Sequence, residues 1–204
     1  MHFAVIGVGG VGGYFGARLA EAGHDVTFIA RGEQLRALRT HGLRVTSHKG
    51  DLHLSPVHVE ADPQAVGVVD CVIVAVKAWQ VADTGQAIRP MVGERTMVLP
   101  LQNGVEASDT LAAILGEEPV LNGLCGILAW RDGPGHIRHF AIEPVVRFGE
   151  RNNERTARID DLQRAFDVCV GAVAEVPTTF ELPCGTSFFS FARKAALVLS
   201  PGRL

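Results

Sequence analysis

A glycine-rich turn near the start of the chain constrains its fold more than any other feature. Gly7-Val8-Gly9-Gly10-Val11-Gly12 follows an apolar run, His2 to Ile6, and opens a helical pattern that continues to Ala22. A strand, a G-x-G-x-x-G turn and a helix in this order are typical of the first unit of a Rossmann-type fold. We therefore expect an α/β protein with a doubly wound, mostly parallel sheet.

Each glycine of this turn has a distinct task if the turn binds a dinucleotide. Gly7 permits the tight turn, and Gly9 leaves room for a pyrophosphate. Gly12, together with Gly13 and Gly16, lets the helix lie close to the sheet. The helix then offers free N–H groups and a positive dipole end to the phosphates. The alternative is a glycine-rich turn with a structural role only. We predict that the cofactor is held by Gly7, Val8, Gly9, Gly10, Val11 and Gly12.

The end of the second predicted strand indicates which cofactor this is. The stretch from Asp25 to Ala30 reads as a strand, and Arg31 follows it. A site for NADH would place an Asp or Glu here, which would bind the ribose 2′-OH. An arginine instead suits a 2′-phosphate, because its guanidinium group donates paired, charge-assisted hydrogen bonds. We therefore predict NADPH as the cofactor. The alternative is that Arg31 is a solvated surface residue.

Composition excludes several classes of protein. The chain has 204 residues, of which 47% are hydrophobic, and a net charge of −3. It lacks the basic footprint of a nucleic-acid-binding protein and an apolar run long enough to span a bilayer. The four cysteines form no C-x-x-C motif and read as reduced thiols. We expect a cytoplasmic protein that binds neither nucleic acid nor membrane, and the sequence leaves its oligomeric state open.

Alternating strands and helices are predicted along the rest of the chain. Further strands are expected at 68–76, 96–101 and 173–176, and helices at 81–91, 106–115 and 155–170. Residues 43–46 and 52–59 resemble a hairpin insertion. Late strands are expected at 120–129 and 135–148, the second interrupted at Pro144. His136 and His139 do not suggest a metal site, because their spacing in a strand puts them on opposite faces.

Polar residues follow two of the buried strands. Lys77 comes directly after the strand at 68–76, and Asn103 follows the strand at 96–101. Ligands of doubly wound sheets bind outside the carboxyl ends of the strands. Lys77 is thus a candidate partner for a phosphate or a substrate carboxylate. Asn103 is a candidate for a ribose, a nicotinamide amide or a substrate hydroxyl. The alternative for each is a polar residue that caps a loop.

Over residues 1–180 the chain resembles the ketopantoate reductases (2-dehydropantoate 2-reductases). The motifs that carry the resemblance are the glycine turn, Ala30-Arg31, Val76-Lys77-Ala78-Trp79-Gln80, Gln102-Asn103-Gly104 and Ala129-Trp130-Arg131-Asp132-Gly133. The resemblance implies reduction of a small 2-keto acid, 2-dehydropantoate, to (R)-pantoate by NADPH, in pantothenate biosynthesis. It also implies that Gly7, Gly9, Gly12 and Arg31 hold NADPH. Lys77, Asn103 and the Ala129 backbone would line the crevice, with Asn103 also on the substrate.

The sequence departs from this family after Phe180. The resemblance leads us to expect a Leu-Trp-x-Lys-Phe helix start that carries the catalytic lysine, followed by a helical substrate domain. Glu181 to Leu204 contain no such motif, and the surroundings of Lys194 do not match it. We therefore assign no catalytic residue. We interpret residues 1–180 as an NADP-binding Rossmann domain and 181–204 as an aberrant tail in place of the helical domain.

A shift of reading frame would explain the tail. When Glu181 to Phe191 are back-translated with permitted codons and read two bases further on, they encode Thr-Ala-Leu-Trp-His-Lys-Phe-Leu-Phe, which contains the expected motif. We infer a frameshift near Phe180–Glu181, which is either natural or a sequencing error, followed by early termination at Leu204. We therefore predict that the DNA encodes a helical domain downstream in the shifted frame. Sequencing the gene tests this, and an immediate stop codon in that frame would contradict it.

Two other functions fit parts of the sequence. One is an oxidoreductase of another NADP family, such as the 6-phosphogluconate or glycerol-3-phosphate type. Lys77-Ala78-Trp79-Gln80 and Gln102-Asn103-Gly104 argue against it. The other is a non-catalytic module that binds NADPH. A steady-state assay with ketopantoate and a titration with NADPH distinguish these functions, because binding without turnover would indicate the non-catalytic module.

Overall fold

A parallel sheet forms the centre of the computed structural model, which describes residues 1–102 and 106–179. Its strands lie in the order β5 (His58–Glu60), β2 (Asp25–Ile29), β1 (His2–Ile6), β6 (Cys71–Val74) and β7 (Met97–Pro100). All neighbouring strands in it are parallel. The strand order reverses between β1 and β6, which is the switch point where sheets of this kind bind ligands. The predicted doubly wound Rossmann-type sheet is confirmed.

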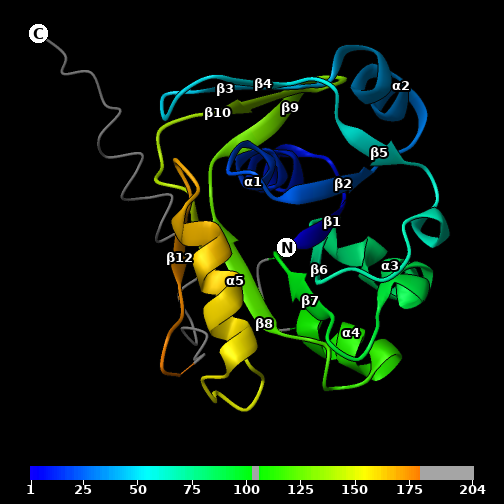
Figure 1. Cartoon of the computed structure of the whole chain (residues 1–204), viewed down its shortest axis with the longest axis vertical. Helices are drawn as coiled ribbons and strands as arrows, with labels where there is room; N and C mark the ends of the chain where they lie inside the picture. Colours follow the sequence, from blue (N-terminus) through cyan, green and yellow to red (C-terminus); the bar gives the residue numbers. More distant parts are fainter. Residues whose placement is uncertain (103–105, 180–204) are drawn as a thin grey trace, which may run out of the picture.

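Helices cover both faces of this sheet (Figure 1). Side chains alternate along β1, so Phe3 and Val5 join one core and Ala4 and Ile6 the other. The first core contains side chains of α1 (Gly10–Glu21), α2 (Gly32–His41) and α5 (Ala157–Asp167). The second contains side chains of α3 (Val81–Ala87) and α4 (Glu106–Leu115). The sheet is therefore buried on both sides, as its nearly continuous apolar strands require.

A second sheet covers the other side of α1, and the sequence analysis did not foresee it. Its strands lie in the order β4 (Leu52–Leu54), β3 (Leu43–Ser47), β10 (His136–His139) and β9 (Ala129–Gly133). Figure 1 shows α1 enclosed between this sheet and the central one. Because both sides of the helix are covered, it needs small residues on more than one side.

The glycines of α1 divide between these two sheets. A Cβ on Gly12 or Gly16 would meet Val5 or Phe28 of the central sheet, as predicted. A Cβ on Gly13 would instead lie 2.7 Å from Ile137 of β10. The prediction that Gly13 serves contact with the central sheet is therefore wrong. Local sequence gives no sign of this, because β10 lies more than a hundred residues further along the chain.

The late strands and the expected insertion also differ from the prediction. Residues 52–59 split into β4, which forms the expected hairpin with β3, and β5, which joins the edge of the central sheet. Residues 120–148 supply four strands rather than two. Of these, β8 (Asn122–Gly126) and β11 (Val145–Gly149) form a third sheet with β12 (Val173–Glu175). Short 3-10 helices lie at Pro63–Ala65, Ala78–Gln80 and Arg89–Met91, the last of which replaces the end of the helix predicted at 81–91.

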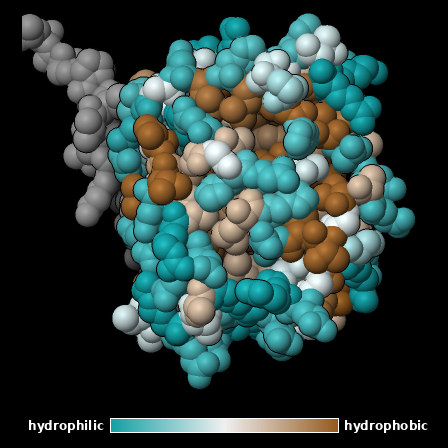
Figure 2. Space-filling view, viewed as in Figure 1, coloured by the Kyte–Doolittle hydropathy of each residue, from teal (hydrophilic) through white to brown (hydrophobic). Residues whose placement is uncertain are grey.

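The surface mixes hydrophobic and hydrophilic residues (Figure 2). Hydrophobic patches on the face shown there are interrupted by hydrophilic side chains. No helix within residues 1–102 and 106–179 is long and apolar enough to cross a membrane. The same residues contain no group of three or more His, Cys, Asp or Glu side chains placed to hold a metal ion. The predicted tail, 181–204, lies outside the described residues.

Candidate dinucleotide site

The glycine turn joins β1 to α1 at the carboxyl edge of the central sheet. Gly7 has a φ of +95°, a conformation that side chains disfavour. A Cβ there would also lie 2.8 Å from the carbonyl group of Ala75, just beyond β6. Gly7 is therefore required both by the turn and by the close approach of the neighbouring chain segment. The predicted tight turn at Gly7 is confirmed.

Gly9 leaves an open space at the amino end of α1. It is the residue before the helix, and apart from its chain neighbours no atom of residues 1–102 and 106–179 lies within 4 Å of the position that its Cβ would take. The backbone N–H groups of Gly10, Val11 and Gly12 have no acceptor within the described part of the chain. These N–H groups and the positive end of the helix dipole form a cradle for an anion. A pyrophosphate group fits this donor set.

Gly10 has a role in packing that the sequence analysis did not assign. A Cβ on Gly10 would lie 2.2 Å from the carbonyl oxygen of Ala129, at the start of β9. The backbone of Ala129 therefore borders the amino end of α1. Val8 is buried, with 5% of its surface exposed, so its side chain anchors the turn in the core.

Two exposed cations lie beside the turn. Arg31 follows β2 and precedes α2, and Lys77 follows β6. These strands flank β1 in parallel, so both residues lie at the same edge of the sheet as the glycine turn. Neither side chain has a hydrogen-bond or ion-pair partner among residues 1–102 and 106–179, and both are exposed. They are available to bind negatively charged groups.

Gln102 is a residue of this edge whose role the sequence analysis did not assign. It follows β7, and only 9% of its surface is exposed. Its Nε2 donates hydrogen bonds to the carbonyl oxygens of Val74 at 3.1 Å and Val76 at 2.9 Å. The end of β7 is thereby tied to the segment that leads to Lys77. Its Oε1 is buried without a partner in the described structure. Asn103, the predicted substrate residue, lies outside the described residues.

The two tryptophans of the chain follow elements of this edge, and the backbone N of Trp130 lies 2.8 Å from the position of a Cβ on Gly10. Trp79 is 80% exposed and lies two residues after Lys77, and Trp130 is 42% exposed and follows Ala129. Leu128, before Ala129, is 44% exposed. Exposed apolar and aromatic side chains therefore lie in the segment after β6 and around the start of β9. The tryptophans also provide fluorescence probes for ligand binding at this edge.

Comparison with known proteins identifies the family. The sequence pattern of the family described as ketopantoate reductase PanE/ApbA matches residues 3–153, well over half of the chain. The chain belongs to this family. The resemblance drawn from the glycine turn and the two strand-end motifs is confirmed.

Individual relatives extend this result. The uncharacterized oxidoreductase YkpB of Bacillus subtilis is 39% identical over 176 residues, covering 86% of this chain and 56% of that protein. The 2-dehydropantoate 2-reductase of a Nostoc species is 34% identical, covering 67% of this chain and 43% of that protein. The crystal structure of 2-dehydropantoate 2-reductase from Porphyromonas gingivalis superposes with a TM-score of 0.82 at 34% identity, over 88% of this chain and 65% of that one. The chain thus spans about half the length of the curated relatives it matches.

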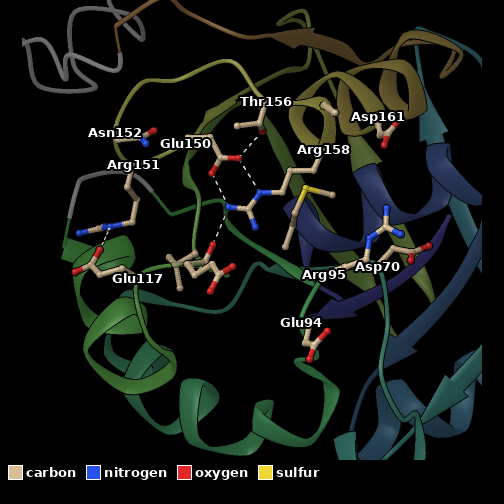
Figure 3. Close-up of a pocket in the computed structure, with 14 residues that line it drawn as sticks. Asp70, Glu94, Arg95, Glu117, Glu150, Arg151, Asn152, Thr156, Arg158 and Asp161 are labelled. Carbon is tan, nitrogen blue, oxygen red and sulfur yellow. Dashed lines mark hydrogen bonds and ion pairs between the residues drawn. The ribbon is translucent and has the colours of Figure 1, made fainter.

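The structure of this ketopantoate reductase family member also contains a large pocket lined by charged residues (Figure 3). It has a volume of about 1090 Å³ and lies where β6 and β7 begin, at Asp70 and Met97, so it opens at the opposite edge of the sheet. Its lining is rich in charge, with six acidic residues and three arginines: Asp70, Glu94, Glu117, Glu118, Glu150, Asp161, Arg95, Arg151 and Arg158. The acidic excess disfavours a phosphate ligand there.

Ion pairs engage two of the three arginines of this pocket, Arg151 and Arg158. Arg158 donates to both carboxylate oxygens of Glu150, at 2.7 and 2.6 Å, and Arg151 pairs with Asp109 and Glu117. Burial opposes ionisation of Glu150, but hydrogen bonds from Arg158 and Thr156 outweigh it and lower the pKa of that carboxyl group. Figure 3 shows these bonds inside the pocket. They join α5 to the end of β11, so we interpret the pocket's charges as structural.

Proposed function

We propose that this chain binds NADPH at the carboxyl edge of the central sheet. The observation that carries the proposal is the combination of an open anion cradle at Gly9 with Arg31 at the end of β2. The first suits a pyrophosphate and the second suits a 2′-phosphate. An acidic residue, which NADH would require at the end of β2, is absent from that position.

The residues of the site divide by the part of the cofactor that they would hold. Gly7, Val8 and Gly9 shape the turn, and the N–H groups of Gly10, Val11 and Gly12 would bind the pyrophosphate. Arg31 would bind the 2′-phosphate. Lys77 would add a second positive charge for a phosphate or a substrate carboxylate. The Ala129 backbone and Asn103 would line the crevice. These assignments agree with the open space and the unpaired donors of this edge.

The reaction that we propose for the whole family protein is the reduction of 2-dehydropantoate to (R)-pantoate. When bound, the cofactor supplies the hydride. The protein must orient the keto group and stabilise negative charge on its oxygen with a proton donor or a positive group. We propose Asn103 as the substrate residue of this domain and assign no catalytic residue within it. The names of the Nostoc and Porphyromonas gingivalis relatives support this substrate.

The 204-residue chain is expected to bind NADPH without turning over substrate. The residues 181–204 lack the lysine motif that the resemblance requires, so the developing charge on the keto oxygen lacks its partner. A steady-state assay with NADPH and 2-dehydropantoate, next to a binding titration, tests this. A kcat in the ordinary enzyme range, on the order of 1–10³ s⁻¹, would contradict the prediction and make Lys194 a candidate.

We also propose a reducing compartment, the cytoplasm, as the place of this function. Cys71, Cys125 and Cys169 are free and buried, so none of them is paired in the described structure. Burial raises the pKa of Cys125 and of Cys169 to about 12. Such thiols are chemically inert and act as small core residues, as is typical of cytosolic proteins.

A further inference from the structure

Gln34 is a buried amide that bonds both the glycine turn and the turn between β9 and β10. It lies in the first turn of α2, three residues after Arg31, and only 6% of its surface is exposed. Its Nε2 donates a hydrogen bond to the carbonyl oxygen of Val8 at 3.1 Å. Its Oε1 accepts one from the backbone N–H of Gly135 at 2.9 Å. Burying an amide is costly unless both of its ends are bonded, and here both are.

The bond to Val8 fixes the orientation of the glycine turn. Val8 lies between Gly7 and Gly9, so its carbonyl group belongs to the same turn that prepares the anion cradle. A carbonyl oxygen directed into the cradle would repel a phosphate. Gln34 holds this oxygen at a buried amide, and the N–H groups of Gly10, Val11 and Gly12 remain the groups available for an anion.

The hydrogen bond from Gly135 connects α2 to the turn between β9 and β10. Gly135 lies in the turn between β9 and β10, with a φ of +72°, and its carbonyl oxygen accepts a hydrogen bond from the N–H of Arg44. A Cβ on Gly135 would lie 3.4 Å from Ala37 of α2. The turn thus packs on α2, and Gln34 joins it to the helix that directly follows Arg31.

We propose that Gln34 is a positioning residue that keeps the pyrophosphate cradle and Arg31 in register, so that one NADPH molecule occupies both. This inference rests on the proposed function, because it assumes that NADPH binds at this edge. Gln34 itself is not placed against the cofactor. It acts through Val8 on the cradle and through α2 on Arg31.

A double-mutant cycle tests this inference. We expect Arg31→Ala to lower the affinity for NADPH at least tenfold in the natural chain, but less than about threefold in the Gln34→Met background. Met has a similar length, but its thioether cannot donate to Val8 and is only a weak acceptor for the N–H of Gly135. Gln34→Met should also reduce the preference for NADPH over NADH. Affinities are measured by isothermal titration calorimetry with each cofactor, and Gln64→Met, at an exposed glutamine, is the matched control.

The possible outcomes distinguish the proposed binding of NADPH from the proposed positioning role of Gln34. If the natural chain binds NADPH no better than NADH, the proposed function fails. If it prefers NADPH and the effects of Arg31→Ala and Gln34→Met multiply independently, only the role of Gln34 fails. Gln34→Asn, whose amide is too short to span both partners, replaces Gln34→Met if that variant unfolds. Unfolding of both variants would also overturn the inference, because it would show a general structural role.

Discussion

Replacing Arg31 with alanine is expected to weaken NADPH binding by about 1.5–3 kcal/mol, roughly tenfold to a hundredfold, and to leave NADH binding nearly unchanged. The side chain is exposed and has no hydrogen-bond or ion-pair partner among the described residues, so its removal breaks no such bond there. The loss should therefore come from the charged hydrogen bonds to the 2′-phosphate. Dissociation constants for both cofactors, measured on the same preparations, give the selectivity directly.

Arg36→Ala is the matched control for this experiment. Arg36 is an exposed arginine of the same helix, α2, so its removal changes the net charge by the same amount. It should alter both affinities only slightly, because the attraction between exposed charges is weakened by solvent and salt. Equal losses of NADPH and NADH affinity in Arg31→Ala would show that Arg31 does not bind the 2′-phosphate.

Gly9→Ala is expected to lower NADPH affinity without lowering stability, whereas Gly10→Ala is expected to lower stability. A Cβ on Gly9 extends into open space, and its φ of −97° is accessible to alanine, so the stability of Gly9→Ala should match that of the natural chain within about 1 kcal/mol. Its NADPH affinity should fall more than about tenfold, because the methyl group takes the room needed by the pyrophosphate. Thermal unfolding and cofactor titration measure the two effects.

Gly10→Ala should instead destabilise the fold. Its Cβ would overlap the carbonyl oxygen of Ala129, and relieving such a clash costs about 1–3 kcal/mol or more, because β9 must move away from α1. Its melting temperature should fall clearly below that of Gly9→Ala. Unimpaired NADPH binding by a stable Gly9→Ala variant would show that the open space at Gly9 is not the pyrophosphate site.

The central features of the site could be predicted because they depend on local sequence. A strand, a glycine turn and a helix follow one another within 22 residues, so the turn at Gly7 needs no distant contact to be recognised. Helix α4 also lies where its apolar spacing predicted it, from Glu106 to Leu115. Lys77 follows a buried parallel strand, and parallel strands place their carboxyl ends at one edge of the sheet.

The features that could not be predicted depend on contacts between distant residues. Strand β3 pairs with β10, and the hydrogen bond between Ser47 and His139 joins residues 92 positions apart. The residue pattern of neither strand indicates which other strand it pairs with. The roles of Gly10 and Gly13 follow from this second sheet. Gln34 resembles any polar helix residue in the sequence, and only the fold shows that it is buried between Val8 and Gly135.

Titrating the 204-residue chain with NADPH and with NADH is the most direct test of the proposal that it binds NADPH at the carboxyl edge of the central sheet. Trp79 lies two residues after Lys77, and the backbone of Trp130 lies beside Gly10, so binding at this edge should quench tryptophan fluorescence. We expect saturable binding of one NADPH per chain. NADPH should bind at least about tenfold tighter than NADH, because NADH lacks the 2′-phosphate and its charged hydrogen bonds. No saturable binding of NADPH, or equal affinity for the two cofactors, would contradict the proposal.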